Sequence, residues 1–285
     1  MTNAKTVLNH YVPKFYLKNF SILGLGKSVW CFDKALKKKF KINVKNIGCE
    51  KGFYSQEIET YLSGIESKAS PVLKKIINHK DLKKLQWHER EILASFIAVQ
   101  DNRTHEVRET MKPATKQLLE WIIASMPDEN KKSLSTEEIK NYINRKAEEM
   151  AVETQEDVLK ESIEQFSNML LGLQWILLEN NTEIPLWTSD NPVNKVNPIK
   201  APPYMPNLGY LCAGVAIYFP LTPKLCLSLC DMAHYGLLPS EKRIMHSTQN
   251  IIYQNHVLFA RSYRHIFSND DNFELAKKIL KDSPT

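Results

Sequence analysis

Apolar residues recur at helical spacing over much of the first 180 positions. Between residues 56 and 79 they return every three or four positions, which predicts a helix that Pro71 breaks or kinks. A second helix is predicted over 86–111, with Pro113 as its boundary or as a kink. A third, over 156–179, is apolar on so many sides that we expect it to be central.

Short runs rich in β-forming residues predict strands at both ends of the chain. Residues 28–32 and 40–44 flank a polar lysine stretch and predict a hairpin. The C-terminal part predicts strands at 184–188, 213–219 and 225–230, and a helix at about 240–260 that packs across them. This order predicts an α+β protein, largely helical, with a small antiparallel sheet built from N- and C-terminal strands.

The most polar part of the chain lies between residues 128 and 155. Ser135 is followed by Thr136, Glu137 and Glu138, a pattern typical of a helix start with acidic residues in its first turn. We therefore interpret residues 1–285 as a single α+β domain with a polar helical insertion at about 128–155. Such a peripheral helix would act as a lid or a partner surface.

Composition narrows the class of protein. With 285 residues, 43% of them hydrophobic and 25% charged, the chain is long enough for a full core and ordinary for a soluble globular protein. It has no apolar run of transmembrane length and no visible secretory signal, so we expect a cytoplasmic protein. Its five cysteines are too few for a disulfide framework and are expected to be reduced thiols.

The net charge of +6 is compatible with a phosphate-bearing partner such as a nucleic acid or a nucleotide. Residues 34–41 supply five of the lysines, and a solvated hairpin surface is the favoured interpretation of that run over a nucleic-acid site.

Two proline-containing motifs and the landmarks between them point to a family. The first motif is His10-Tyr11-Val12-Pro13 and the second is Ser189-Asp190-Asn191-Pro192. Further landmarks are Phe20, Gly52 to Ser55, Ile65-Glu66, Gln100 with Arg103, and Phe219 to Pro223. In this order they resemble a bacterial family known as a domain of unknown function, whose members open with HYVP and later carry SDNP. The resemblance implies candidate site residues, Asn255 among them, and no reaction.

Gln100 and Arg103 lie on an otherwise apolar stripe of the second predicted helix. An arginine facing a core needs a carboxylate, carbonyl groups or a bound anion, because an unpaired buried charge is costly. A structural ion pair is the favoured interpretation, and an anion-binding arginine in a pocket is the alternative. Asp101 and His105 lie on a different face and are expected to be exposed.

Asp190 and Asn191 precede a proline, where side chain to backbone hydrogen bonds stabilise a turn. That structural role explains both residues, but strand ends are also common places for catalytic carboxylates. Asp190 is therefore the best candidate for a general base or for a ligand to a divalent metal. His10 precedes the first helix and is either a structural histidine or an acid–base group that titrates near neutral pH.

Several signatures are absent from the sequence, including GxxxxGK[ST], GxGxxG, GxSxG and HExxH, which disfavours the enzyme classes that use them. Cys226, Cys230 and His234 are spaced by four, but without a second pair they are a weak zinc signal.

Two functions from different classes fit these observations. The first is a nuclease-like hydrolase of a phosphodiester or nucleotide, in bacterial defence or stress response, with His10 and Asp190 catalytic. The substrate-binding residues would be Gln100, Arg103, Asn191 and Asn255. The alternative is a non-catalytic ligand-binding or protein-interaction component. A shared site requires the HYVP segment and the SDNP turn to be neighbours in space, as we predict.

Overall fold

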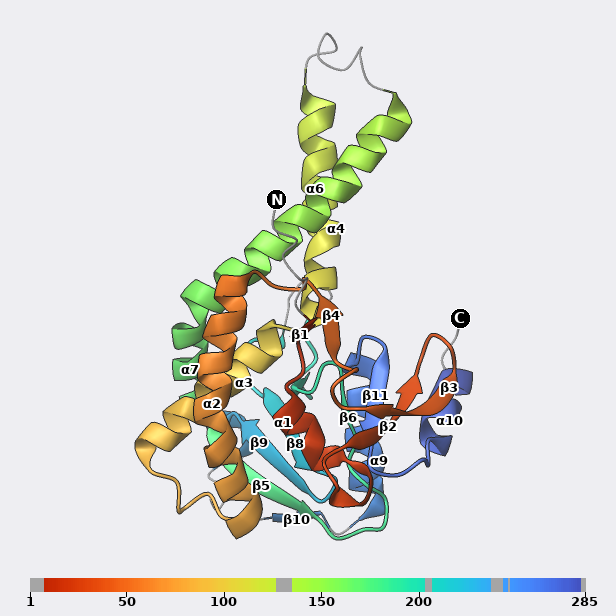
Figure 1. The fold of residues 1–285 in the computed structure, drawn as a ribbon. Helices are drawn as coiled ribbons and strands as arrows, with labels where there is room; N and C mark the ends of the chain where they lie inside the picture. The colour runs from red at the N-terminus through yellow and green to blue at the C-terminus, as the bar shows by residue number, and fades with distance from the viewer. Residues whose placement is uncertain (1–7, 127–134, 203–206, 237–242, 246, 283–285) are drawn as a thin grey trace.

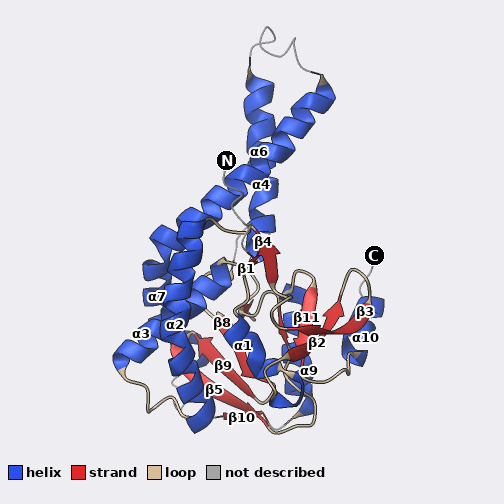
Figure 2. Ribbon diagram, viewed as in Figure 1, coloured by secondary structure: helices blue, strands red, loops and turns tan. Residues whose placement is uncertain are grey.

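A computed structural model describes residues 8–126, 135–202, 207–236, 243–245 and 247–282. Helices and small sheets are mixed along the chain, and strands from both termini share one sheet (Figure 2). The predicted α+β class is confirmed.

Three helices pack side by side over one part of the body: α2 (Gln56–His79), α3 (Trp87–Asn102) and α7 (Ile163–Leu171). The helix α2 runs through Pro71 without interruption, so the predicted break at this residue is wrong. Because proline has no backbone N–H, the carbonyl of Ser67, four residues earlier, has no helical hydrogen-bond partner. Pro71 and Ser67 are both exposed at the helix surface.

The predicted helix over 86–111 is in fact two helices. The helix α3 ends at Asn102, and α4 (His105–Ser125) begins after Thr104, whose backbone is extended. The carbonyl of Arg103 accepts a hydrogen bond from the Tyr54 hydroxyl, which replaces a helical partner at the break. Pro113 lies inside α4 and does not end it.

Two helices form the part of the molecule that extends away from the body in Figure 1. They are α4 and α6 (Thr136–Asp157), which contact each other along their length. A capping box between Ser135 and Glu138 begins α6, in line with the predicted helix start. The insertion expected at 128–155 falls on α6, and its residues 128–134 lie outside the described residues.

The larger sheet has the strand order β10-β5-β9-β8-β7. Its β10–β5 pair is parallel and its other pairs are antiparallel. The strands are β5 (Gln174–Asn180), β7 (Asn194–Val196), β8 (Ala216–Thr222), β9 (Leu225–Cys230) and β10 (Arg243–Met245).

The helix predicted over 156–179 is therefore wrong in its last third. A π-helical turn, η3 (Val158–Ser162), leads into α7, which ends before Gly172, and β5 starts at Gln174. The apolar residues that suggested a helix instead fill a strand between β9 and β10. Likewise, the helix predicted at 240–260 is α9 (Thr248–Arg261), because residues 243–245 form β10.

The smaller sheet has the order β3-β2-β11-β6, and all its pairs are antiparallel. The hairpin of β2 (Ser28–Asp33) and β3 (Lys38–Asn43) is as predicted, and β11 (His265–Ser268) joins it to β6 (Thr188–Ser189). Of the predicted strand 184–188, only Thr188 lies in a strand. Side chains of Asn180 and Asn255 bind the backbone at 184–187 in place of a strand partner.

The remaining described elements are short or terminal. They are β1 (Leu8–His10), which pairs with β4 (Cys49–Lys51), then α1 (Lys14–Leu17), η1 (Lys18–Phe20), η2 (Ile22–Gly24), α8 (Met232–Tyr235) and α10 (Glu274–Asp282).

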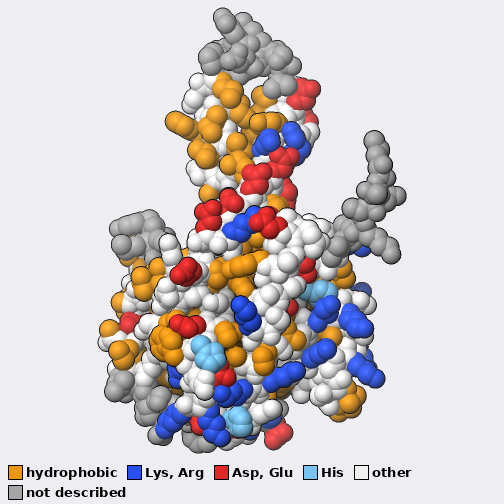
Figure 3. All heavy atoms as spheres, turned by 60° about the vertical axis from the view of Figure 1, so that its left-hand side comes forward, with side chains coloured by type: hydrophobic (Ala, Val, Ile, Leu, Met, Phe, Trp, Pro, Cys, Tyr) orange, Lys and Arg blue, Asp and Glu red, His pale blue; other side chains and the backbone are white. Residues whose placement is uncertain are grey.

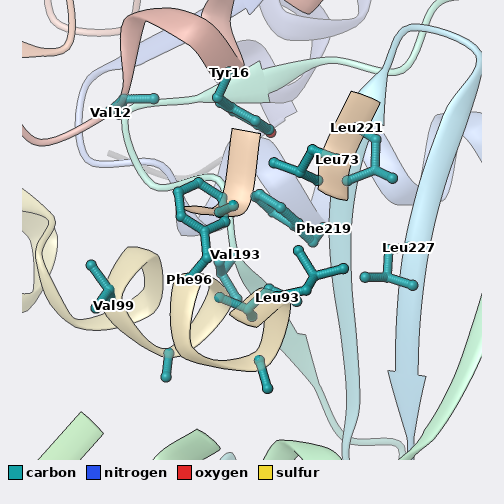
Figure 4. Packing of buried hydrophobic residues seen from close by; sticks show 14 of the residues in the cluster. Val12, Tyr16, Leu73, Leu93, Phe96, Val99, Val193, Phe219, Leu221 and Leu227 are labelled. Carbon is teal, nitrogen blue, oxygen red and sulfur yellow. The ribbon is translucent and has the colours of Figure 1, made fainter. Parts of the chain in front are cut away.

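Aromatic side chains join the two sequence motifs inside the core. The ring of Tyr16 stacks on that of Phe219 at 5.0 Å between centroids, and the ring of Phe96 lies 6.1 Å from that of Phe219 (Figure 4). The Tyr16 hydroxyl lies 2.8 Å from Thr188 Oγ1 and donates a hydrogen bond of 2.6 Å to the carbonyl of Pro220. Tyr16, three residues after the HYVP motif, thus contacts Thr188, just before the SDNP motif, whereas a shared site of His10 and Asp190 stays a prediction.

We predict that Tyr16→Phe lowers the free energy of unfolding by about 1–3 kcal/mol, because the buried Pro220 carbonyl and Thr188 hydroxyl lose their partner. Urea unfolding followed by circular dichroism measures the change. Tyr253→Phe, which removes an exposed hydroxyl from α9, is the matched control. Equal stability of the two variants would contradict the structural role of this hydroxyl.

Candidate functional site

His10 is held at the end of β1 with one ring nitrogen fixed. Its Nε2 lies 3.1 Å from the carbonyl oxygen of Lys45, in the loop after β3. A carbonyl oxygen only accepts hydrogen bonds, so Nε2 carries the proton. In the neutral ring, Nδ1 is then an unprotonated acceptor, which is the form that a general base requires.

The His10 ring lies at a cavity of about 440 Å³. Polar residues reach it from three directions: the HYVP segment and α1, the loop after β3, and the helix α2. We call it the His10 cavity, and its lining consists of Leu8, His10, Lys14, Phe15, Lys18, Val44, Lys45, Glu59, Ser63 and Glu66.

Positive charge in the His10 cavity is not balanced by direct partners. The side chains of Lys14, Lys18 and Lys45 form no ion pair within the part of the chain that the structure describes. The two carboxylates are already engaged, since Glu59 accepts a hydrogen bond of 3.0 Å from Asn9 and Glu66 pairs with an arginine. The cavity therefore suits an anionic ligand.

The pKa of His10 is lowered from its ordinary value of 6.5. Burial of the half-exposed ring is the main cause, and the nearby Lys14 ammonium group acts in the same direction. The imidazole is therefore mainly neutral at pH 7.

Arg103 lies next to this cavity and is completely buried. Its Nη1 donates to Glu66 at 2.8 Å, and its Nε donates to Gln100 Oε1 at 3.0 Å. Gln100 in turn donates from Nε2 to the carbonyl of Tyr11 at 3.0 Å. This chain of bonds fixes the position of the backbone next to His10 and of the Glu66 carboxylate at the cavity wall. The structural ion pair was the favoured interpretation of Arg103, and this geometry agrees with it.

Asp190 lies away from the His10 cavity lining and has its own set of partners. Its carboxylate accepts three backbone hydrogen bonds, from Tyr263 at 2.9 Å, Arg264 at 2.7 Å and His265 at 2.6 Å. Burial raises its pKa from 3.8 to about 6, against the lowering effect of those three donors. The carboxylate thus closes the turn between α9 and β11.

Asn191 and Asn255 also bind backbone groups. Asn191 Nδ2 donates to the carbonyl of Arg261 at 2.9 Å, and its Oδ1 lies 3.3 Å from the Thr104 hydroxyl. Asn255 accepts from the backbone N–H of Trp187 and donates to the carbonyl of Pro185, both at 2.9 Å. Both asparagines hold loops in place beside the smaller sheet.

The structure therefore divides the sequence-predicted residues into two groups. His10 lines the His10 cavity, and Gln100 and Arg103 form a network beside it that reaches the Tyr11 backbone, whereas Asp190, Asn191 and Asn255 anchor the C-terminal segments. Among the described residues, no hydrogen bond or ion pair joins one group to the other.

Sequence reasoning missed the lysines and carboxylates that complete the cavity. Lys14 and Lys18 are four apart at the first helical turns after the HYVP motif, which is a usable signal, but Lys45 comes from a loop and gives none. The sequence also predicted that Asp101 and His105 are exposed, which is wrong.

Asp101 is buried, with its carboxylate 2.6 Å from Lys195 Nζ and bonded to the Tyr210 hydroxyl. His105 belongs to α4, not α3, and its ring stacks on that of Tyr263. Residues distant in sequence thus cover both side chains.

Within the described residues, no group of three or more His, Cys, Asp or Glu side chains is placed to hold a metal ion, at Asp190 or elsewhere. No helix there is long and apolar enough to cross a membrane.

Comparison with known proteins gives a family. The family model described as "Protein of unknown function (DUF4238)" matches residues 9–272. The chain belongs to the DUF4238 family. The match includes His10, every element from α1 to β11, and Asn255. Searches of curated proteins and of solved structures gave no match.

We predict that Arg103→Ala lowers the free energy of unfolding of this DUF4238 protein by about 3–5 kcal/mol, because Glu66 and Gln100 lose a buried charged partner. Chemical unfolding measures the loss. Arg145→Ala, which breaks an exposed pair with Glu149 on α6, should change stability by less than about 1 kcal/mol. An Arg103→Ala protein as stable as the parent would show that the bonds of Arg103 to Glu66 and Gln100 do not stabilise the fold.

Proposed function

We propose that the His10 cavity binds a phosphate-bearing ligand and that the chain hydrolyses a phosphodiester or a nucleotide there, with His10 as general base. One observation carries the proposal. The ring of His10, whose Nε2 is bonded to the Lys45 carbonyl, lines the same cavity as three lysines that have no acidic partner among the described residues.

Substrate binding follows from the charge of the lining. Phosphate groups carry negative charge at neutral pH, and ammonium groups are compact donors for their oxygens. Lys14 approaches from α1, Lys18 from η1 and Lys45 from the loop after β3, so a phosphate between them would be contacted by more than one segment. A cavity of about 440 Å³ has room for a nucleotide-sized group.

Catalysis would use the neutral form of His10. The Lys45 carbonyl holds the Nε2 proton, so Nδ1 would take a proton from the attacking water. As the water oxygen bonds to phosphorus, the bond between phosphorus and the leaving oxygen breaks, and the leaving oxygen takes a proton from solvent. The lowered pKa keeps this nitrogen unprotonated at pH 7. The lysines would stabilise the charge that develops on the phosphoryl oxygens in the transition state.

Asp190 has no part in the proposed step. Its carboxylate is buried and its hydrogen bonds close the α9–β11 turn, so a proton transfer would break the contacts that hold this segment. Asn191 and Asn255 are likewise bonded to backbone groups, so the proposal gives them a structural role and no contact with the substrate.

The same cavity supports a second function, non-catalytic binding of a phosphate-bearing ligand. The observation in its favour is that Glu59 and Glu66, the two carboxylates of the cavity, are each already bonded to a neighbouring side chain. No carboxylate of the lining is then free to act as the partner acid of His10, whereas many hydrolases use an acid and a base together. Binding without turnover would identify this second function.

We predict that His10→Gln lowers kcat by about 10²–10⁴-fold on RNA, DNA or nucleotide substrates assayed with and without divalent metal. Glutamine retains a donor for the Lys45 carbonyl, so the melting temperature should be unchanged. His79→Gln, at the exposed end of α2, is the control that should keep full activity. Because the pKa of His10 is lowered, activity of the parent should be lost on acidification only below pH 6.5. Full activity in His10→Gln would exclude this residue as the base.

We predict that Lys14→Met with Lys45→Met weakens binding of a nucleoside monophosphate at least roughly 100-fold, because each charge-assisted bond contributes about 1.5 kcal/mol or more. Isothermal titration calorimetry measures the affinity. The control is Lys38→Met with Lys41→Met, which removes the same charge from the exposed strand β3. An equal loss in both double variants would mean that overall charge, and not the cavity, binds the phosphate.

A further inference from the structure

Lysines without acidic partners continue from the His10 cavity onto the smaller sheet. Lys18 and Lys45 belong to the cavity lining. Lys27, the residue before β2, and Lys41 of β3 lie outside it and are exposed. None of the four forms an ion pair in the described part of the chain. In Figure 3, Lys and Arg side chains gather on the right-hand side of the body, with few acidic ones among them.

Two contacts place Lys27 beside the lysines of the cavity. The stem of Lys18 lies next to Gly26, since a methyl group at Gly26 would be 3.7 Å from the Lys18 Cγ. The backbone N–H of Val44, the residue before Lys45, donates to the Lys27 carbonyl at 3.1 Å. Lys27 therefore connects the rim of the cavity with the start of the β2–β3 hairpin.

The strand β3 carries the positive charge further from the cavity. It is an edge strand of the smaller sheet, and Lys41 lies directly opposite Trp30 of β2, so both side chains are on the same face. The Trp30 ring is partly exposed. We call Lys18, Lys27, Lys41 and Lys45 the basic track, which has Trp30 at its outer end.

Other lysines of the hairpin have partners of their own. Lys34 donates to backbone carbonyls at the end of α9, and Lys39 pairs with Asp271 at 2.7 Å. Lysines on an edge strand also deter the pairing of two sheet edges. Lys18 and Lys27 lie outside β3, however, so this protective role does not explain why the free charges lead to the cavity.

The chemistry of the basic track fits a single-stranded nucleic acid. Proteins bind single strands through a positive surface that follows the phosphates and through aromatic rings on which bases stack. The basic track supplies lysines from three segments and the partly exposed ring of Trp30. A double helix is too wide for a cavity of about 440 Å³, whereas one nucleotide of a single strand fits.

We propose that the basic track binds a single strand of RNA or DNA, one nucleotide of which lies in the His10 cavity. This inference rests on the proposed function and names an oligonucleotide, and not a free nucleotide, as the ligand of that site. Successive phosphates contact the lysines of the track, and a base stacks on Trp30. A free nucleotide reaches only the cavity, so the track distinguishes the two ligands.

The test compares two ligands on full-length proteins. Fluorescence anisotropy measures binding of labelled oligo(U) and oligo(dT) of about 12 nucleotides, and isothermal titration calorimetry measures binding of a nucleoside monophosphate. Lys27→Met with Lys41→Met should weaken oligonucleotide binding about 10-fold or more, because two phosphates lose their cations. Its affinity for the nucleoside monophosphate should equal that of the parent.

A matched control removes the same charge elsewhere on the body. Lys74→Met with Lys84→Met replaces an exposed lysine in the second half of α2 and one in the loop after it, neither with an acidic partner among the described residues. This variant should bind both ligands as the parent does. A stronger effect on oligo(U) than on oligo(dT), or the reverse, identifies the kind of strand.

The salt dependence gives a second readout. Each phosphate contact of a single strand contributes about −0.7 to the slope of log affinity against log salt concentration. Loss of two contacts in Lys27→Met with Lys41→Met should therefore make the oligonucleotide slope shallower by about 1.4. The slope for the nucleoside monophosphate should stay unchanged.

Three results would overturn the basic track. They are a parent that binds the oligonucleotides no more tightly than the nucleoside monophosphate, equal losses in the track variant and its control, and equally tight binding of poly-L-glutamate through the same lysines. Failure of the proposed function looks different. Lys14→Met with Lys45→Met would then keep its affinity for the nucleoside monophosphate, which contradicts the cavity and with it this inference.

Discussion

The guanidinium group of Arg103 has no contact with solvent, and the bonds it forms determine how three parts of the chain meet. It joins α2 through Glu66 and α3 through Gln100, and Gln100 holds the backbone beside His10. The Arg103 carbonyl also binds Tyr54 where α3 gives way to α4. A buried charge is costly unless its partners are placed accurately, so this network favours one arrangement of the helices around the His10 cavity.

The polar residues of the two motifs, and Asn255, differ in what their side chains contact. Asp190, Asn191 and Asn255 satisfy backbone groups that would otherwise be buried without partners. His10 differs from them, because one ring nitrogen is fixed by a carbonyl while the ring faces a cavity rich in lysine. The three C-terminal residues thus hold backbone groups in place, whereas a chemical role at the cavity is what we propose for His10.

Local signals in the sequence were sufficient for part of the fold. Alternating β-formers on either side of a lysine turn predicted the β2–β3 hairpin, and the apolar stripe around Arg103 predicted that it is buried. The strand β5 was not predictable in this way, since a buried strand and a buried helix are equally apolar. The partners of Asp101 and the position of Lys45 depend on contacts between distant segments, which the spacing of residues in one segment does not encode.

The most direct test of a phosphate-binding His10 cavity is the titration of the His10 imidazole by NMR, with its signal assigned by its absence in His10→Gln. We predict a pKa below 6.5 in the free protein, since burial and Lys14 disfavour the charged ring. Inorganic phosphate should raise that pKa, because an anion in the cavity favours the protonated ring. A His10 pKa that does not respond to phosphate would contradict the assignment of this cavity.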